Sequence, residues 1–225
     1  MISGILKRLA ACLPPLIQHE LKCLHYRRQI LTRCFKSDEP EYSVLDFLLS
    51  PGDWAIDIGA NIGQYSRRFS DLVGPEGRVV AIEPVTETFS LLAANAGCFP
   101  HNNVTLLNMA ASDEISMTGM NIPCFKNGLK NYYEACLCPD GGACRVMSFP
   151  IDALHIPFPV QLVKIDVEGH ELAVLAGMQK TIQNYHPIII MEKGSLQAVH
   201  FLEKFDYRCH DLDGSPNHLM MADRY

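Results

Sequence analysis

Four ionisable side chains are crowded into residues 166–171, in the sequence D-V-E-G-H-E. They follow a largely apolar run, Val160 to Ile165, which predicts a strand of the core. Ligands of open α/β sheets bind at the carboxyl ends of strands, so this loop is a candidate catalytic site. We expect His170 to act as a general base, because its reference pKa of about 6.5 lies near the working pH. Asp166 and Glu168 would orient it or bind the hydroxyl group of an acceptor.

A purely structural interpretation explains only part of this loop. An acidic first helical turn, favoured by the helix macrodipole, accounts for Glu171 but not for its combination with His170. We expect Lys164 to point to the opposite side of the strand from the acid that follows it, and to pair with a carboxylate.

A second candidate site is the segment W-A-I-D-I-G-A-N-I-G-Q-Y-S, residues 54–66. It predicts a buried strand, a tight turn at Gly59 and Gly63, and the start of a helix, which together are typical of a nucleotide site. A dinucleotide fingerprint requires a central glycine, but Asn61 stands there. Asp57 at the strand end and the Asn61 amide suit a ligand with an ammonium and a carboxylate. We therefore expect S-adenosylmethionine rather than NAD.

Two further segments are placed to hold the rest of that ligand. Glu83 follows the apolar run 78–82, twenty residues after Gly63, where an acid can accept hydrogen bonds from both ribose hydroxyls. The small residues after a third predicted strand leave room for adenine, and Ala111, Ser112 and Asp113 would border it. An ordinary turn would explain these last residues equally well.

Strands and helices alternate along the chain, which predicts a doubly wound α/β sheet with one antiparallel edge. The expected strands end in a hairpin, and lie at 54–58, 78–82, 104–108, 160–165, 188–191, 207–211 and 218–222. An edge strand is expected at 146–150. Residues 114–145 are the least periodic part, and such a stretch is usually functional or disordered. Four cysteines lie in it, but their spacing matches no paired zinc pattern.

Residues 2–35 alternate apolar and basic side chains and are broken by Pro14-Pro15, which predicts two helices. We expect a helical cap packed on the core. The alternatives are a lid over the substrate or a basic amphipathic segment that contacts an anionic membrane.

Composition narrows the class of protein. With 19 Lys and Arg against 25 Asp and Glu, the net charge of −6 does not favour nucleic acid as a partner. No secretory leader is evident, so the nine cysteines are expected to be reduced thiols of a soluble cytoplasmic protein.

Four motifs in order give the chain a family resemblance: D-I-G-A-N-I-G-Q-Y-S at 57–66, A-I-E-P at 81–84, N-M-A-A-S-D at 108–113 and K-I-D-V-E-G-H-E-L at 164–172. Together they resemble the FkbM family of S-adenosylmethionine-dependent methyltransferases. The resemblance implies a class I methyltransferase sheet with strand order 3-2-1-4-5-7-6, in a domain of residues 50–225 preceded by an extension, 1–49. It also implies methylation of a hydroxyl on a sugar, glycolipid or polyketide-type metabolite.

Three rival interpretations remain open. A methyltransferase of the same fold could use magnesium held by Asp166, Glu168 and Glu192 to lower the pKa of the hydroxyl. A partner subunit could keep the cofactor pocket without the chemistry. An NAD-dependent oxidoreductase is the weakest, because Asn61 replaces the pyrophosphate glycine.

Overall fold

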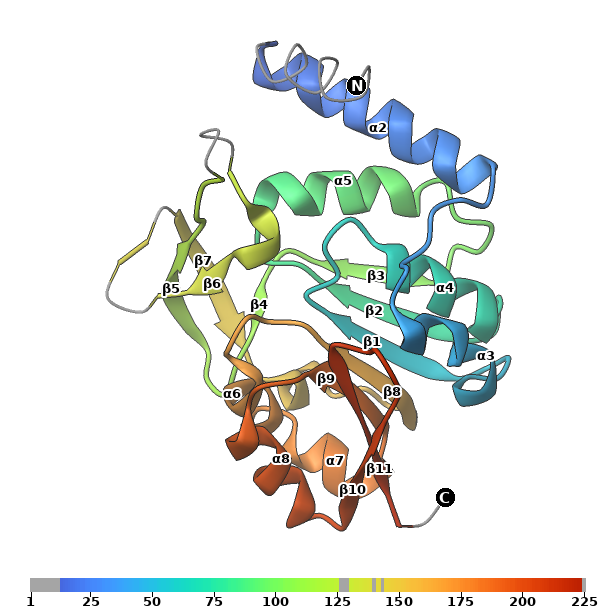
Figure 1. Ribbon diagram of the computed structural model, residues 1–225, viewed down its shortest axis with the longest axis vertical. Helices are drawn as coiled ribbons and strands as arrows, with labels where there is room; N and C mark the ends of the chain where they lie inside the picture. Colours follow the sequence, from blue (N-terminus) through green and yellow to red (C-terminus); the bar gives the residue numbers. More distant parts are fainter. Residues whose placement is uncertain (1–12, 126–129, 139–140, 143, 224–225) are drawn as a thin grey trace.

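The computed structural model describes residues 13–125, 130–138, 141–142 and 144–223, and its centre is a seven-stranded sheet (Figure 1). The strands are β1 (Trp54–Ile58), β2 (Arg78–Ile82), β3 (Val104–Leu107), β8 (Val160–Ile165), β9 (Ile188–Glu192), β10 (Tyr207–Asp211) and β11 (Asn217–Ala222). Their spatial order is β10-β11-β9-β8-β1-β2-β3. Numbered one to seven along the chain, they read 3-2-1-4-5-7-6 from the β3 edge, as the resemblance implied. β11 runs antiparallel to both neighbours, and the other pairs are parallel.

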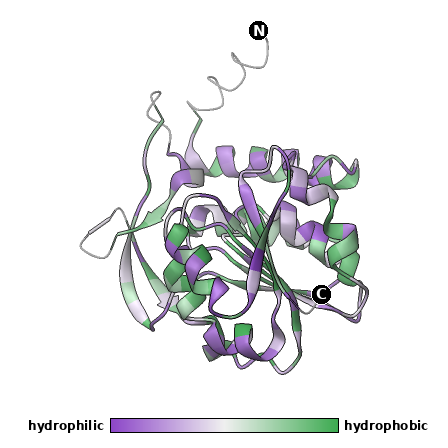
Figure 2. Ribbon diagram, turned by 60° about the horizontal axis from the view of Figure 1, so that its bottom comes forward, coloured by the Kyte–Doolittle hydropathy of each residue, from purple (hydrophilic) through white to green (hydrophobic). Residues whose placement is uncertain are grey.

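Helices cover both faces of this sheet. One face packs against α3 (Leu45–Leu48), α4 (Gln64–Val73) and α5 (Thr86–Ala96). The other packs against α6 (Glu171–Ala176), α7 (Gln179–Tyr185) and α8 (Leu196–Glu203). Figure 2 shows that the strands enclosed between these layers are rich in hydrophobic residues, as expected for parallel strands buried on both faces.

The two-residue period of the strands decides which side chains meet. Ile56 and Ile58 of β1 lie in the cluster beneath α6, α7 and α8, whereas Ala55 lies in the cluster with α4. Asp57, two residues after Ala55, therefore lies on the α4 side of the sheet. Lys164 is its direct neighbour on β8 and shares that side, because Leu162 also belongs to the α4 cluster.

Part of the stretch that shows no periodicity folds as a second sheet, beside the first (Figure 1). It consists of β4 (Ala110–Ala111), β5 (Ser116–Asn121), β6 (Cys136–Leu137) and β7 (Cys144–Phe149), in the order β4-β7-β5-β6. The strand expected at 146–150 is present as β7, but it is not an edge strand, because it pairs with β4 on one side and β5 on the other. Short 3-10 helices η2 (Tyr132–Glu134) and η3 (Ile151–Leu154) complete this region.

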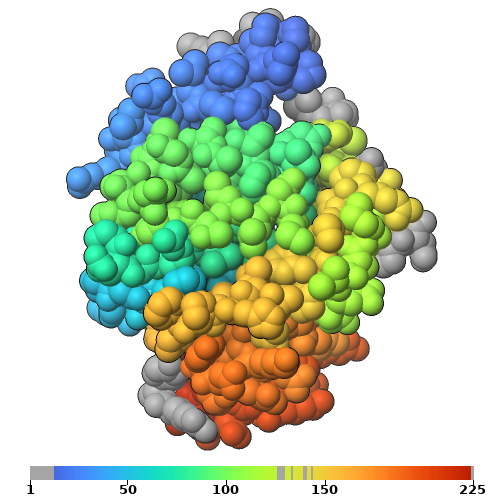
Figure 3. Space-filling model, turned by 180° about the vertical axis from the view of Figure 1, so that it is seen from behind, coloured from blue at the N-terminus to red at the C-terminus, as the bar shows by residue number. Residues whose placement is uncertain are grey.

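The described part of the N-terminal extension begins with one long helix, α2 (Pro15–Leu31), followed by the 3-10 helix η1 (Pro40–Ser43). The first of the two expected helices falls on residues outside the described part. α2 packs against α5 and forms the outermost layer at one end of the molecule (Figures 1 and 3). No helix among the described residues is both long enough and apolar enough to cross a membrane.

Candidate active site

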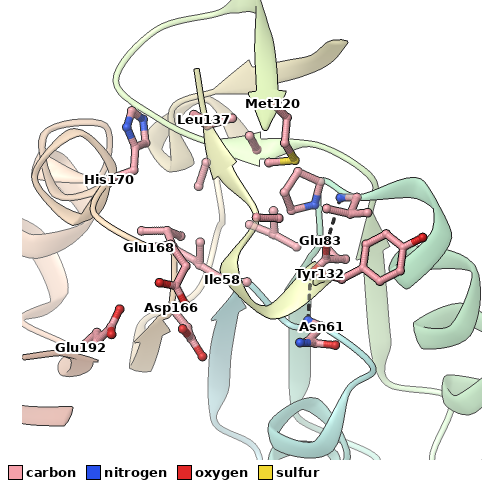
Figure 4. Close-up of a pocket in the computed structure, with 18 of the residues that line it drawn as sticks. Ile58, Asn61, Glu83, Met120, Tyr132, Leu137, Asp166, Glu168, His170 and Glu192 are labelled. Carbon is pink, nitrogen blue, oxygen red and sulfur yellow. Dashed lines mark hydrogen bonds between the residues drawn. The ribbon is translucent and has the colours of Figure 1, made fainter. Parts of the chain in front are cut away.

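A cavity of about 270 Å³ lies at the carboxyl ends of β1, β2 and β8 (Figure 4). Its walls come from both sheets. The main sheet contributes Gly59, Asn61, Glu83, Asp166, Glu168, His170 and Glu192, and the second sheet with its loops contributes Ala111, Met120, Tyr132 and Leu137. The three candidate catalytic residues and four of the eight candidate cofactor residues thus line one cavity.

Glu83 is buried at the end of β2, with both carboxylate oxygens anchored. Oε2 accepts a hydrogen bond from the backbone N–H of Asn61 at 2.9 Å, and Oε1 accepts one from the N–H of Val85 at 2.9 Å. Burial raises the pKa of Glu83 to about 7, although these two hydrogen bonds favour its charged form. Each oxygen keeps a second lone pair, so the fixed carboxylate can still accept a ligand hydroxyl from the cavity.

The glycine turn after β1 has different roles at its three named positions. Gly59 has a φ of +77°, and a Cβ there would overlap the carbonyl oxygen of Asp166. Asn61 also has a positive φ, 50°, a conformation for which Asn is well suited, and it lines the cavity. Gly63 precedes α4 and does not line the cavity. A Cβ at that position would lie 2.6 Å from Cδ1 of Leu92, so this glycine allows close packing of α5.

We predict that Gly59→Ala destabilises the fold more than Gly52→Ala does. Both glycines have left-handed backbones, with φ of +77° and +93°, so each substitution costs about 1–2 kcal/mol in conformation. Only at Gly59 does the new Cβ meet neighbouring backbone, that of Asp166 directly after β8, which adds about 1–3 kcal/mol of overpacking. Urea unfolding of both variants measures the difference, and equal losses would contradict the close approach of Gly59 to Asp166.

Asp57 lies behind the cavity, not in its wall. Its Oδ2 accepts a hydrogen bond from the Ser66 hydroxyl at 2.5 Å, and no donor among the described residues reaches Oδ1. Burial raises the pKa of Asp57, while the positive charge of Lys164 on the neighbouring strand opposes that shift. Asp57, which we expected to meet the ligand directly, thus takes part in a buried network behind the cavity wall.

Lys164 pairs with Asp166 from the same side of the chain, which corrects our expectation that it points the other way. The two residues are two positions apart, so the strand period places both on one side. Lys164 Nζ lies 2.7 Å from Oδ2 of Asp166 and 4.6 Å from the centre of the Tyr65 ring. Although its own burial opposes the charge, Asp166 and Asp57 raise the pKa of Lys164, which therefore remains protonated.

Three carboxylates gather at one end of the cavity. Oxygens of Asp166, Glu168 and Glu192 all lie within 4.8 Å of one another, and Figure 4 shows these side chains together. Burial, then the charges of Glu192 and Asp166, raise the pKa of Glu168 to about 7. Burial and the charge of Asp166 also raise the pKa of Glu192. Such a cluster can accept a proton near neutral pH or hold a hard divalent cation.

The backbone at Glu168 is strained. Its φ of 49° lies in the left-handed region, which non-glycine residues adopt at a cost of about 1–3 kcal/mol. Gly169, with a φ of 89°, completes the turn, and the backbone N–H of Gly169 donates a 2.9 Å hydrogen bond to Oε1 of Glu171. Glu171 is buried and its carboxylate holds the loop. Its role is therefore structural, in agreement with the macrodipole explanation of this acid.

His170 points toward the other end of the cavity, away from the carboxylates (Figure 4). Its Nε2 lies 2.9 Å from the Ser112 hydroxyl, which is also 3.1 Å from Oδ1 of Asp113. Burial lowers the pKa of His170, against the opposite influence of Asp113. Of the predicted adenine segment, Ala111 lines the cavity, Ser112 is buried behind it and Asp113 is exposed. The structure thus places His170 beside the adenine segment.

Several cavity residues were missed from the sequence. Met120 and Leu137 come from strands of the second sheet, Tyr132 from η2, and Asn217 from the start of β11. The one sequence feature that could have indicated close packing here is Gly119. A Cβ at this position would overlap the backbone of Gly141, so the second sheet requires a glycine there. Their short strands carry no periodicity long enough to reveal which side chains face inward.

A buried acid ties the N-terminal extension to the cavity wall. Glu41 accepts hydrogen bonds from Ser215 at 2.6 Å, from Tyr65 at 3.1 Å and from the Asn217 amide. Although burial opposes it, these donors hold the pKa of Glu41 below its ordinary value. The contacts fix Asn217 in the cavity wall, so the end of the extension is part of the structure around the site.

The sheet order, the glycine turn after β1 and the acid after β2 define the class I methyltransferase fold. An FkbM methyltransferase from Methylobacillus flagellatus KT has this fold, with a TM-score of 0.53 and 16% identity, over 92% of this chain and 59% of that chain. SMU.1697c from Streptococcus mutans, crystallised in complex with SAH, gives a TM-score of 0.50 and 12% identity, over 80% of this chain and 92% of that one.

The protein belongs to the FkbM methyltransferase family, because the FkbM methyltransferase domain matches residues 57–209. It is 28% identical over 138 residues to the hexuronic acid methyltransferase AglP of Haloferax volcanii. That match covers 60% of this chain and 53% of AglP, so the chain spans about half of the length of this relative.

Proposed function

We propose that the protein transfers a methyl group from S-adenosylmethionine to a hydroxyl of a sugar, glycolipid or polyketide-type metabolite. The observation that carries this proposal is one cavity with a fixed acid, Glu83, on one side and three carboxylates on the other (Figure 4). The first suits the ribose of the cofactor, and the second suits an acceptor hydroxyl. The relative AglP is named for a sugar acid, which supports a sugar as acceptor.

The residues that line the cavity can be assigned separate roles in the transfer. Glu83 would hold the ribose, Gly59 and Asn61 the methionine part, and Ala111 the adenine edge. Bound S-adenosylmethionine would supply its sulfonium methyl group to the acceptor oxygen, with S-adenosylhomocysteine as the second product. The hydroxyl proton must go to a nearby base, so catalysis rests on alignment and on that proton acceptor.

We assign the proton acceptor to Glu168 and treat His170 as the competing candidate. Glu168 combines a pKa of about 7 with a strained backbone and a place among the carboxylates. His170 is held beside Ser112, near the expected position of the adenine. Both residues line the cavity, so only substitution of each can decide between them.

A magnesium-assisted reaction is a second candidate. It is favoured by the closeness of Asp166, Glu168 and Glu192, whose carboxylate oxygens all lie within 4.8 Å of one another. The three carboxylates are the hard ligands that magnesium prefers, so the residues fit the ion. A bound ion would lower the pKa of the acceptor hydroxyl. On this alternative the carboxylates act as ligands, and none of them needs to take the proton.

The test is mass spectrometry of candidate sugars, glycolipids and polyketide-type hydroxyl compounds, incubated with the protein and methyl-labelled S-adenosylmethionine. We expect the label on an acceptor oxygen and an equal amount of S-adenosylhomocysteine. Label on carbon or nitrogen would contradict O-methylation. Cofactor binding without transfer to any acceptor class would favour an inactive partner subunit.

A further inference from the structure

The helix α2 has one face packed on the protein and one face that contacts nothing described. On the packed face, Cys23, Tyr26 and Ile30 join a cluster with Leu91 of α5. His19, on the same face, lies 3.4 Å from Ser90 of α5. α2 therefore caps α5, as the sequence predicts, and none of its residues lines the described cavity.

The opposite face of α2 exposes five large apolar side chains. These are Leu16, Ile17, Leu21, Leu24 and Leu31, with exposed fractions of 81%, 47%, 45%, 61% and 71%. At 3.6 residues per turn they fall within an arc of about 140°. We call these five residues the leucine face. So much apolar surface on one helix is typical of a binding surface rather than of scattered exposed residues.

Positive charge lies within and beside the leucine face. Arg27 and Arg28 are exposed and fall within the same arc, as does the exposed acid Glu20, and Lys22 is exposed on the same helix. The first 36 residues contain seven Lys and Arg and a single acid, Glu20, although the whole chain has a net charge of −6. The positive charge is thus concentrated in the segment that carries the unpartnered apolar side chains.

We infer that the leucine face of α2 binds the surface of an anionic lipid bilayer, with the helix axis in the membrane plane. Leucines of such helices enter the boundary between headgroups and acyl chains, while Lys and Arg remain among anionic headgroups. A second copy of the chain is a poorer occupant, because both copies would bring the same excess of seven Lys and Arg over one acid to the contact. This inference goes beyond the proposed function and does not depend on it.

The direct test is co-sedimentation of the full chain with phosphatidylcholine vesicles, with and without phosphatidylserine. We expect binding that requires phosphatidylserine and weakens as salt is added. The triple variant Leu16→Ser, Leu24→Ser, Leu31→Ser should lose at least tenfold in affinity. Arg27→Gln with Arg28→Gln should remove the preference for phosphatidylserine, and Glu20→Gln should strengthen binding.

A matched control uses exposed apolar residues away from α2. Phe47, Ile115 and Met117 have exposed fractions of 87%, 66% and 58%, so their triple substitution by Ser removes similar apolar surface. This control should bind vesicles like the unmodified protein. Equal losses in both triple variants would overturn the inference.

Two other results would also overturn it. Light scattering could show a dimer that dissociates in the leucine-face variant while vesicles are not bound, which would make the face a contact between two copies. A monomer that binds neither kind of vesicle would show that the leucine face does not bind a bilayer. None of these measurements uses methyl transfer, so they stand or fall separately from the proposed activity.

Discussion

Replacing Glu168 with Gln should lower kcat by about 10² to 10⁴ and leave the affinity for S-adenosylmethionine nearly unchanged. The amide keeps the size of the side chain but cannot take a proton, and this is the usual contribution of a general base. Steady-state kinetics with a labelled methyl donor measures kcat, and calorimetry measures affinity. Glu114→Gln, an exposed acid outside the cavity wall, is the matched control and should keep full activity.

The pH profile gives this prediction a second readout. A base works only when deprotonated, so the rate should rise with pH toward the Glu168 pKa of about 7 and level off above it. The profile must be measured at saturating cofactor. The pKa of Glu83 is also about 7 in the free protein, so weaker cofactor binding at low pH would otherwise imitate the titration of Glu168. Burial lowers the pKa of His170 below its ordinary value, so a histidine base would place the rise at lower pH.

Two outcomes would reassign the proton acceptor. If His170→Ala loses 10² or more in kcat while Glu168→Gln stays active, the histidine is the base. If Asp166→Asn and Glu192→Gln are as damaging as Glu168→Gln, and a chelator stops the unmodified enzyme, the carboxylates act as magnesium ligands. Loss of activity on chelation, restored by magnesium, is the signature of that second case.

Glu83→Gln should weaken S-adenosylmethionine binding at least tenfold. On the proposed binding mode Glu83 would accept two charge-assisted hydrogen bonds from ribose, each contributing about 1.5–3 kcal/mol. Gln keeps one oxygen for a backbone N–H but loses the charge and one acceptor. Calorimetry at pH 8 measures the loss, and Glu76→Gln is the control, because Glu76 is exposed and lies outside the cavity wall.

Glu83 also predicts a pH dependence of cofactor binding. Its pKa is about 7 in the free protein, and ribose hydroxyls favour the charged form. Affinity should therefore rise with pH through about 7 and level off above it, and this rise should vanish in Glu83→Gln. Unchanged affinity and pH dependence in a folded variant would show that Glu83 only anchors the turn through Asn61 and Val85.

The sequence predicts the sheet well because its long parallel strands carry strong local signals. Fully apolar runs such as Ile188 to Met191 can bury their side chains only when both faces of the strand are covered. The hairpin after Tyr207 is also where the turn residues place it. The second sheet was missed because two of its strands, β4 and β6, contain only two residues each. Such strands are defined by their partners, not by a local pattern.

The roles of individual residues in the site depend on contacts between segments that are far apart in the sequence. Asp57 seemed free to meet the ligand, but strand parity turns it toward Ser66 and Lys164. A histidine was the natural choice of base, because reference pKa values place carboxylic acids too low. Glu168 reaches a pKa of about 7 through burial and through Glu192, which comes from a different strand. No local motif contains that pairing, although the magnesium alternative already brought Glu192 together with Asp166 and Glu168.

The central claim is that the cavity binds S-adenosylmethionine, and calorimetry with three ligands tests it most directly. The protein should bind S-adenosylmethionine and S-adenosylhomocysteine, and should not bind NAD, because Asn61 occupies the position of the pyrophosphate glycine. The same titration of Glu83→Gln should show both affinities reduced together. Binding of NAD with no response to S-adenosylmethionine or S-adenosylhomocysteine would contradict the account.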